Sequence, residues 1–311
     1  MRKQTKLFLI FVAVLSMLVF SSVSVLAAEA GTDWYGGTIT VEGYGAPPVN
    51  AHSAAQARML ARRAAVVDAY RNLAEEVSGV NVDAETTVLN METQSDVVKT
   101  KVSALVKGAR IVSEEVQGDG SYKVVMQIPM YGVSSSLASA VLTPPAKQEA
   151  FPAPVAGVAP TTVKVTVTVP TPAPTPAPAP AAKPSDGSSA APVPSSAAGM
   201  SAVGGYTGLV VDCRGLDLKP VMSPVIRNAN GEPIYGFKNL NYQKVIANGM
   251  AGYTSDINAV SRAGSNPLVI KAASLENHNG YPVLSVADAN RVLVENQASG
   301  FLNNCAVVFV R

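Results

Sequence analysis

The sequence predicts an α+β protein of two small modules joined by a Pro/Ala-rich disordered tether. The first observation is an ordered pattern over residues 31–143, in which strand-like runs flank one long helical pattern. The second is a further set of short strands and helices over residues 205–311, which predicts a mixed α/β module. The third is the loss of such patterning over residues 144–204, where proline, alanine and serine dominate and cannot bury enough apolar surface to offset the entropy of ordering.

The first residues have the layout of a secretory signal. A basic start precedes an apolar run over residues 7–20, and small residues follow it. This run is shorter than the ~20 apolar residues that a membrane span needs. We therefore predict a signal peptide over residues 1–28 that is cleaved within 27–30. The mature protein is expected to be exported and to have no integral membrane span.

The N-terminal module is predicted to begin with a strand at residues 38–42 that ends at Gly43-Tyr44-Gly45. Asn50 is the expected N-cap of a long helix that continues to about residue 77. Five larger apolar side chains recur at helical spacing and should form the face that packs on the sheet. They are Met59, Val66, Tyr70, Leu73 and Val77.

The remainder of this module is predicted to complete a small antiparallel sheet under the long helix. A strand is expected near residues 82–88. Residues 111–116 and 122–128 should form a hairpin around the turn at Gly118-Asp119-Gly120. Residues 133–141 are expected to form a short closing helix.

The C-terminal module has its own set of local signals. Asn230-Gly231 between apolar runs predicts a hairpin over residues 224–235. Ser285 and Asp288 have the spacing of an N-cap and its third helical residue, which predicts a helix starting there. The other expected elements are strands at 209–212, 268–273, 283–284 and 305–310 and a helix at 242–248.

Both cysteines, Cys213 and Cys305, lie in strand-like runs of the C-terminal module. An exported protein can form disulfides, and a bridge here would close a loop of roughly 90 residues. It requires that the two Cα atoms lie within about 7 Å. The sequence leaves open whether these cysteines form a disulfide or remain two buried free thiols.

Composition and motifs argue against nucleic-acid binding and against catalysis. The net charge is +2, and aromatic residues make up only 6% of the chain. The two histidines, His52 and His278, fall in different modules without neighbouring ligands or acids at a useful spacing. The chain carries no nucleophile elbow, paired-histidine zinc motif or phosphate-binding loop. We therefore expect no enzyme activity, no cofactor and no metal site.

The N-terminal module, at residues 36–142, resembles the Lpp-twenty lipoprotein family and the related amino-terminal domain of the flagellar assembly protein T. The features that carry the resemblance are, in chain order, Gly43-Tyr44-Gly45, Pro47, the Arg/Ala-rich helix at 61–77, Gly79-Val80, a middle strand marked by 106–110 and a last strand at 122–129. The resemblance implies an envelope module that assembles with protein partners and has no catalytic residues. In the flagellar relative, the domain contributes to a ring around the basal body. The lipid-bearing cysteine of the family is missing here.

The resulting hypothesis is an exported, non-catalytic structural or assembly protein, periplasmic or associated with the outer membrane. Its expected partners are envelope proteins, including copies of itself, in the flagellar basal body or another outer-membrane complex. The alternative is a secreted or surface module that binds cell wall, a glycan or a secreted ligand. That alternative predicts aromatic residues in one concavity, with Trp34, Tyr35 and Tyr44 as candidates. A hydrolase of unrecognised type would instead need polar side chains converging in a pocket.

Overall fold

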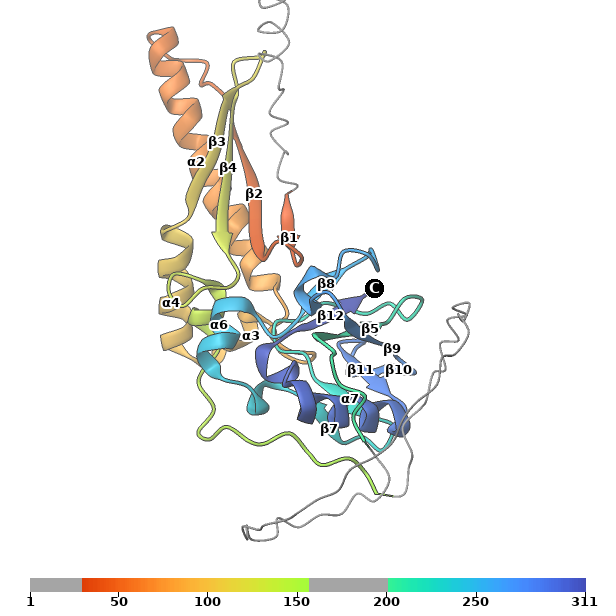
Figure 1. The fold of residues 1–311 in the computed structure, drawn as a ribbon. Coiled ribbons are helices and arrows are strands. Elements are labelled where there is room, and N and C mark those ends of the chain that lie inside the picture. Colours follow the sequence, from red (N-terminus) through yellow and green to blue (C-terminus); the bar gives the residue numbers. More distant parts are fainter. Residues whose placement is uncertain (1–29, 157–200) are drawn as a thin grey trace, which may run out of the picture. The chain divides into compact units, whose positions relative to one another are not determined.

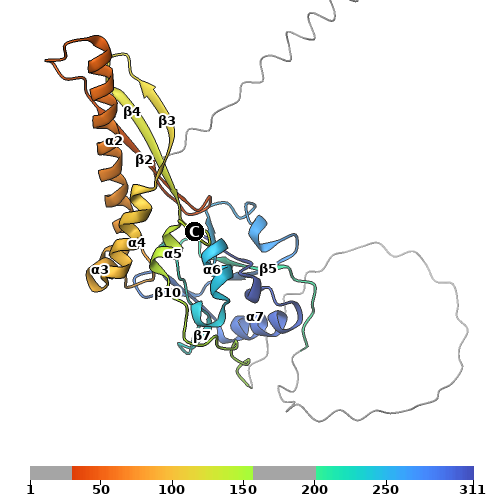
Figure 2. The same cartoon turned by 90° about the vertical axis from the view of Figure 1, so that its left-hand side faces the viewer.

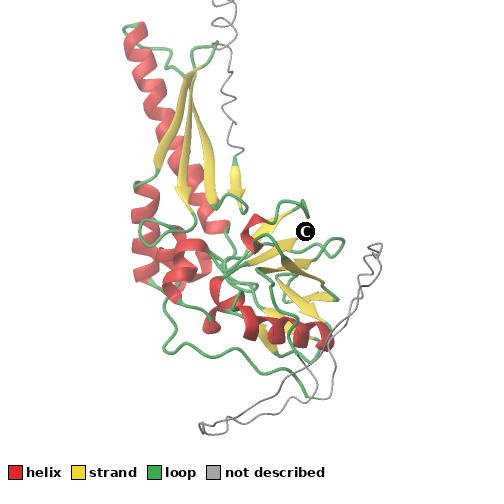
Figure 3. Ribbon diagram, in the orientation of Figure 1, coloured by secondary structure: helices red, strands yellow, loops and turns green. Residues whose placement is uncertain are grey.

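The computed structural model describes residues 30–156 and 201–311 (Figure 1). The predicted signal peptide at 1–28 and the central part of the predicted linker lie outside these residues. Within them, helices and strands are combined in two modules, one before and one after the predicted linker (Figure 3). The predicted α+β class is therefore confirmed.

The sheet of the N-terminal module has four strands in the order β1-β2-β4-β3, and every neighbouring pair is antiparallel. The strands are β1 (Gly31–Asp33), β2 (Thr38–Gly45), β3 (Arg110–Val116) and β4 (Tyr122–Pro129). The predicted first strand and the predicted hairpin are both present. The hairpin forms β3 and β4, and β2 pairs with β4 along eight residues.

The long helix α2 (Ala54–Gly79) lies along one face of this sheet (Figure 2). It begins three residues later than predicted, because Ser53 and not Asn50 is its N-cap. The Ser53 hydroxyl accepts the backbone N–H of Gln56 at 3.2 Å, which satisfies one of the free donors of the first turn. The helix ends at Gly79, as the sequence indicates.

The backbones of α2 and β2 lie in direct contact. A Cβ atom built on Gly43 would overlap the carbonyl oxygen of Ala65 and the backbone nitrogen of Ala69. A Cβ atom on Gly45 would overlap the carbonyl oxygen of Ala61. The strand can therefore carry only glycine at these two positions, and the helix presents alanine opposite them. The Gly-Tyr-Gly motif is explained by this close approach of two backbones.

The short distance between the backbones of α2 and β2 determines which face of α2 is buried. Leu73 and Val77 are fully buried, as predicted. Val66 and Tyr70 are only partly buried, and Met59 is 62% exposed, so the prediction is wrong at the start of the helix. The buried positions there are three alanines, because a larger side chain would hold the helix away from the sheet.

The predicted strand at residues 82–88 is absent, apart from a single bridge between Asn81 and Thr87. The Asp83 carboxylate accepts the backbone N–H groups of Glu85 and Thr86, each at 2.8 Å, and bends the chain into a turn. Two helices follow this turn, α3 (Val88–Gln94) and α4 (Asp96–Lys107). The hydroxyl of Thr87 caps the first of them.

Residues 106–110, expected to mark the middle strand, instead contain the end of α4 and the start of β3. The helix buries Val102 and Leu105, which lie one turn apart on one face, and Gly108 caps its end. Strand β3 begins only at Arg110. The predicted closing helix is present as α5 (Leu137–Val141).

The C-terminal module contains two four-stranded sheets. The first has the order β8-β12-β5-β9, and its neighbouring strands are all parallel. The second has the order β10-β11-β6-β7 and contains one parallel and two antiparallel pairs. The strands are β5 (Gly208–Asp212), β6 (Ile226–Asn228), β7 (Pro233–Tyr235), β8 (Gly252–Thr254), β9 (Pro267–Lys271), β10 (Ser274–Glu276), β11 (Tyr281–Leu284) and β12 (Val307–Val310).

The local signals of this module are confirmed. Strands β6 and β7 form the hairpin around Asn230-Gly231. Helix α6 (Tyr242–Asn248) has the predicted bounds. Helix α7 (Val286–Ser299) starts after Ser285, whose hydroxyl accepts the backbone N–H of Asp288 at 3.1 Å. Short 3₁₀ turns occur at Phe237–Asn239, Ser261–Ala263 and Leu302–Asn304.

The described residues from Gly31 onward fall in one compact unit, and the buried apolar residues of both modules form a continuous cluster. Backbone hydrogen bonds cross between the modules. The N–H of Gly132 donates to the carbonyl of Ile246 at 2.6 Å, and that of Ser223 donates to Val82 at 2.8 Å. Contacts with the C-terminal module extend past the predicted boundary at residue 143, because the side chain of Asn290 exchanges two hydrogen bonds with the backbone of Val155.

We expect Gly43→Ala to lower the free energy of unfolding by about 1–3 kcal/mol, because the added methyl overpacks a contact between two backbones. Urea unfolding followed by circular dichroism measures this loss. Gly79→Ala is the matched control, since its Cβ would meet open space. It should be neutral or raise the stability by up to about 1 kcal/mol. Equal stability of the two variants would contradict the close approach of α2 and β2.

Candidate functional site

Strand β3 is the most exposed regular element of the N-terminal sheet. It lies at the end of the strand order, and β4 is its partner on one side only among the described residues. All seven of its residues are exposed, including the apolar Ile111, Val112 and Val116 at 38%, 49% and 48%. Open strand edges of this kind present unpaired backbone donors and acceptors that another strand can use.

An ion pair fixes this edge to the long helix. The guanidinium of Arg62 on α2 donates to both carboxylate oxygens of Glu114 on β3, at 2.7 and 2.5 Å, and the hydroxyl of Tyr122 donates to the same carboxylate at 3.0 Å. The Arg62 hydrogen bonds hold the pKa of Glu114 below its ordinary value. An exposed pair of this kind contributes at most about 1 kcal/mol, so its main effect is to orient the strand.

Tyr44, one of the three aromatic candidates, lies on the sheet and not in a cavity. Its hydroxyl donates to Glu42 at 2.6 Å, and Lys123 forms an ion pair with the same carboxylate. The hydrogen bonds from Lys123 and then Tyr44 lower the pKa of Glu42. Tyr44 is 51% exposed, and its ring lies 5.8 Å from the Lys123 ammonium. Tyr44, Glu42 and Lys123 thus bind one another at the surface of the sheet.

The other two aromatic candidates do meet in one concavity. Trp34 and Tyr35 line a cavity of about 470 Å³ together with Tyr131 and Tyr253. The rings of Trp34 and Tyr253 pack edge to face with centroids 5.6 Å apart. Burial raises the pKa of Tyr131 to about 12, so its hydroxyl stays protonated at neutral pH. The Tyr253 hydroxyl is bound to the backbone of Val221, at 2.9 and 3.2 Å. The cavity therefore offers aromatic faces and the neutral hydroxyl of Tyr131.

The one charged side chain that lines this cavity, Arg262, is bound to the protein itself. Its guanidinium donates to the carbonyl groups of Asn248, Gly249 and Cys305 at 2.7, 2.6 and 2.9 Å. These bonds join three separate segments and satisfy a large part of the donor capacity of the side chain. Arg262 thus stabilises the cavity wall by linking these segments through hydrogen bonds.

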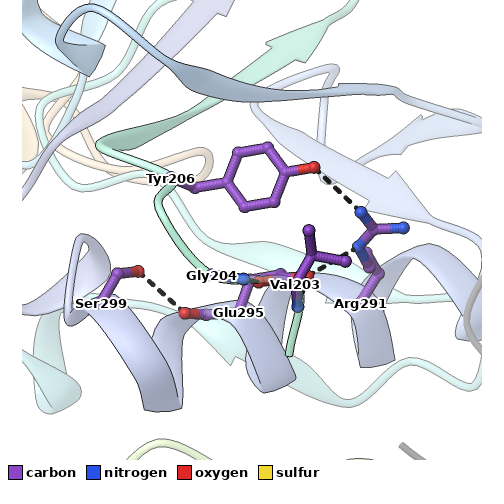
Figure 4. A network of polar contacts seen from close by, with 6 residues as sticks. All are labelled: Val203, Gly204, Tyr206, Arg291, Glu295 and Ser299. Atoms are coloured by element: carbon purple, nitrogen blue, oxygen red, sulfur yellow. Dashed lines mark hydrogen bonds and ion pairs between the residues drawn. The ribbon is translucent and has the colours of Figure 1, made fainter. Parts of the chain in front are cut away.

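A buried carboxylate organises helix α7 (Figure 4). Glu295 is 1% exposed and accepts the backbone N–H groups of Val203 and Gly204 at 3.0 and 2.9 Å. It also forms an ion pair with Arg291 at 3.1 Å, and Arg291 in turn donates to the hydroxyl of Tyr206. Both carboxylate oxygens therefore hold the last residues of the predicted linker against the helix.

The two cysteines are free, buried thiols that the structure places far apart. In the parallel pair of β5 and β12, Val307 lies opposite Leu209 and Val310 opposite Asp212. Cys213 follows one end of this pair and Cys305 precedes the other. At ~3.3 Å per residue they are separated by on the order of 15–20 Å, which exceeds the reach of a disulfide. This arrangement favours the alternative of two buried free thiols.

Neither histidine lies in a cluster of ligands. His52 is exposed before the start of α2, and His278 lies in a turn with a φ angle of 54°. Within residues 30–156 and 201–311, no group of three or more histidine, cysteine or acidic side chains is placed to hold a metal ion. In the same part of the chain, no helix combines the length and apolar character that membrane crossing requires.

The N-terminal module is thus a long helix on a small antiparallel sheet with β3 at its open edge. Residues 45–129 match the family model of the LPP20 lipoprotein. Residues 208–311 match the second domain of Treponema pallidum Tp0624. No curated protein matches the chain.

The LPP20 match confirms the resemblance on which the sequence interpretation of the N-terminal module rests. It supports an exported, lipoprotein-like protein associated with the cell envelope. The second match relates the C-terminal module to a known domain. Each match covers one module only.

We expect both thiols to react with Ellman's reagent only after unfolding. Burial raises the pKa of Cys213 to about 12 and also raises the pKa of Cys305, so near pH 8 neither forms a reactive thiolate. The native protein should release almost no chromophore, and the protein in denaturant should titrate as two thiols per chain. Absence of free thiols in denaturant before reduction would show a disulfide and contradict this arrangement.

Proposed function

We propose that this protein is a non-catalytic structural or assembly protein of the cell envelope that binds protein partners through the open edge of β3. The observation that carries the proposal is a seven-residue edge strand, exposed at every position, within the module that matches the LPP20 family. Main-chain hydrogen bonds along such an edge supply affinity, and its exposed side chains supply specificity.

Three features support an edge that is kept for a partner. Ile111 and Val112 are apolar at positions where edge strands that avoid pairing carry charges or proline. The ion pair of Arg62 with Glu114 holds the strand in place before any partner arrives. The register shift between Ile111 and Ser113 is confined to one point, so residues from Ser113 to Val116 remain regular.

We further propose that the partners are other envelope proteins or copies of this chain, in the flagellar basal body or another outer-membrane complex. The support for this finer assignment is the resemblance of the N-terminal module. We place the protein in the periplasm or at the outer membrane, with secretion as the alternative. The absence of a catalytic role is likewise a proposal, supported by the use of Arg262 and Glu295 to bind the protein's own backbone.

The test is a pull-down of the tagged protein from gently crosslinked, fractionated cells, with partners identified by mass spectrometry. Val112→Lys places a charge on the edge and should reduce partner recovery about tenfold, equivalent to roughly 1.4 kcal/mol. Because Val112 is 49% exposed, the free energy of unfolding should change by no more than about 0.5 kcal/mol.

Val67→Lys on α2 is the matched control, since Val67 is 69% exposed and lies on a different element. It should leave partner recovery unchanged. The proposal is supported if basal-body or outer-membrane components are recovered with the parent protein and with the Val67→Lys control, and are lost with the Val112→Lys variant. Recovery from culture fluid alone, without stable protein partners, would overturn it in favour of a secreted binding module.

A second function is favoured by one observation, the aromatic cavity of Trp34, Tyr35, Tyr131 and Tyr253. Aromatic faces beside hydroxyl groups suit the apolar ring faces and polar edges of sugars. We propose cell-wall or other glycan fragments as its ligand, in agreement with the alternative hypothesis from the sequence. The cavity provides no free cation for catalysis, because Arg262 is engaged by carbonyl groups.

Trp34 is the single tryptophan of the chain and reports directly on this cavity. Soluble cell-wall fragments should quench its fluorescence in a saturable way. Tyr35→Ala should weaken this binding about tenfold, because it removes one aromatic wall that is 63% exposed in the free protein. Tyr44→Ala, which lies on the sheet outside the cavity, should not. No fluorescence change, or equal loss in both variants, would refute glycan binding here.

A further inference from the structure

A second cavity, of about 670 Å³, lies entirely within the N-terminal module. We call it the α4 cleft. One wall is the face of α4 that carries Lys101, and the opposite wall is the turn at residues 134–136 before α5. The start of β3 at Arg110 and the end of β4 close the sides. Of the features proposed above, the β3 edge shares only Arg110 with this cleft.

The charges that line the α4 cleft are both positive. They are Lys101 and Arg110, and no aspartate or glutamate lines the cavity. Neither cation forms an ion pair with another described residue, whereas Arg62, Arg71 and Lys123 of the same module each have a carboxylate partner. Two unpaired cations at one cavity leave a local positive potential although the net charge of the whole chain is only +2.

Hydroxyl groups add neutral donors to these charges. The hydroxyls of Ser134, Ser135 and Thr38 line the cleft and make no hydrogen bond to another described residue. The neighbouring Ser136 and Ser139 hydroxyls are occupied, because each binds the backbone of this turn. The turn is thus held by two serines and presents two others to the cavity. Cations together with several hydroxyl donors match the oxygen atoms of a phosphate group.

Two exposed valines lie near residues of the cleft along the chain. Val97 lies four residues before Lys101 and therefore on the same face of α4, one turn away. Val133 immediately precedes Ser134 on the opposite wall. They are 64% and 65% exposed. Apolar groups at the rim of a basic site are the arrangement that suits a membrane surface, where phosphate groups lie above an apolar layer.

We propose that the α4 cleft binds the phosphate of an anionic phospholipid headgroup and holds the N-terminal module against a membrane surface. Lys101 and Arg110 neutralise the phosphate, and the serine hydroxyls donate to its remaining oxygens. Val97 and Val133 contact the interface beside it.

The test is flotation of the mature protein with vesicles of phosphatidylglycerol and phosphatidylcholine in equal parts, compared with phosphatidylcholine alone. Binding should require the anionic lipid and should fall as salt is added. Lys101→Gln with Arg110→Gln should weaken it roughly 30-fold, because each basic side chain near an anionic surface contributes about a fivefold factor. Circular dichroism establishes that this variant is folded.

The matched control is Arg58→Gln with Arg63→Gln, which removes the same charge from exposed positions on α2. It should bind the anionic vesicles as the parent does. Equal loss in both double variants would show attraction by net charge alone and overturn the site. Ser134→Ala with Ser135→Ala keeps all charges and should weaken binding a few-fold; an unchanged affinity would contradict the role of the hydroxyls.

Titration calorimetry with inorganic phosphate separates the two sources of the ligand chemistry. Competition by phosphate for vesicle binding agrees with the proposal. The protein could instead bind inorganic phosphate through Lys101 and Arg110 and fail to bind vesicles. That result would show that the cleft binds a free anion, and it would overturn the proposed phospholipid ligand. Loss of a protein partner in the double variant, again without vesicle binding, would assign it to a protein interface. Arg110 is also the first residue of β3, whereas Lys101 and the two serines lie outside that strand.

Discussion

The contact between the backbones of α2 and β2 determines the N-terminal module. Gly43 and Gly45 remove the side chains that would separate the strand from the helix, and alanines on α2 fill the remaining space. A helix this close covers only the strands directly beneath it. Strand β3, at the end of the sheet, is consequently left exposed along its whole length. The packing that stabilises the module thus creates the edge through which we propose it assembles.

The N-terminal module contains charged side chains that form ion pairs and others that form none. Two ion pairs join α2 and the strands of the sheet to one another, Arg62 with Glu114 and Lys123 with Glu42. The unpaired Lys101 and Arg110 are found where α4 approaches the end of the sheet. In the C-terminal module, the buried charge of Glu295 is fully used by backbone donors and an arginine. Buried polar groups there fix the chain, whereas Lys101 and Arg110 lie exposed on the N-terminal module.

Much of the fold could be predicted from sequence because its signals are local. The β3–β4 hairpin, the Asn230-Gly231 turn and the Ser285 cap each depend on residues a few positions apart, and all are present. The strand expected at residues 82–88 failed for a local reason too, since the Asp83 side chain competes for backbone donors and forms a turn. The candidate sites were harder to predict from the sequence, because their residues come from distant segments of the chain. Trp34 and Tyr35 were recognised as aromatic candidates, but only folding joins them to Tyr253.

The sequence by itself determined the α+β class, the two modules, most helix and strand positions and the resemblance of the first module. Tertiary structure decided which face of α2 is buried, because the distance between two backbones selects side-chain size, and periodicity alone favours larger residues such as Met59. Tertiary structure also decided how far apart the two cysteines lie. Strand-like runs around Cys213 and Cys305 are visible in the sequence, but whether they pair in parallel or antiparallel is set by non-local contacts. Their parallel register places the two thiols at opposite ends of the pair.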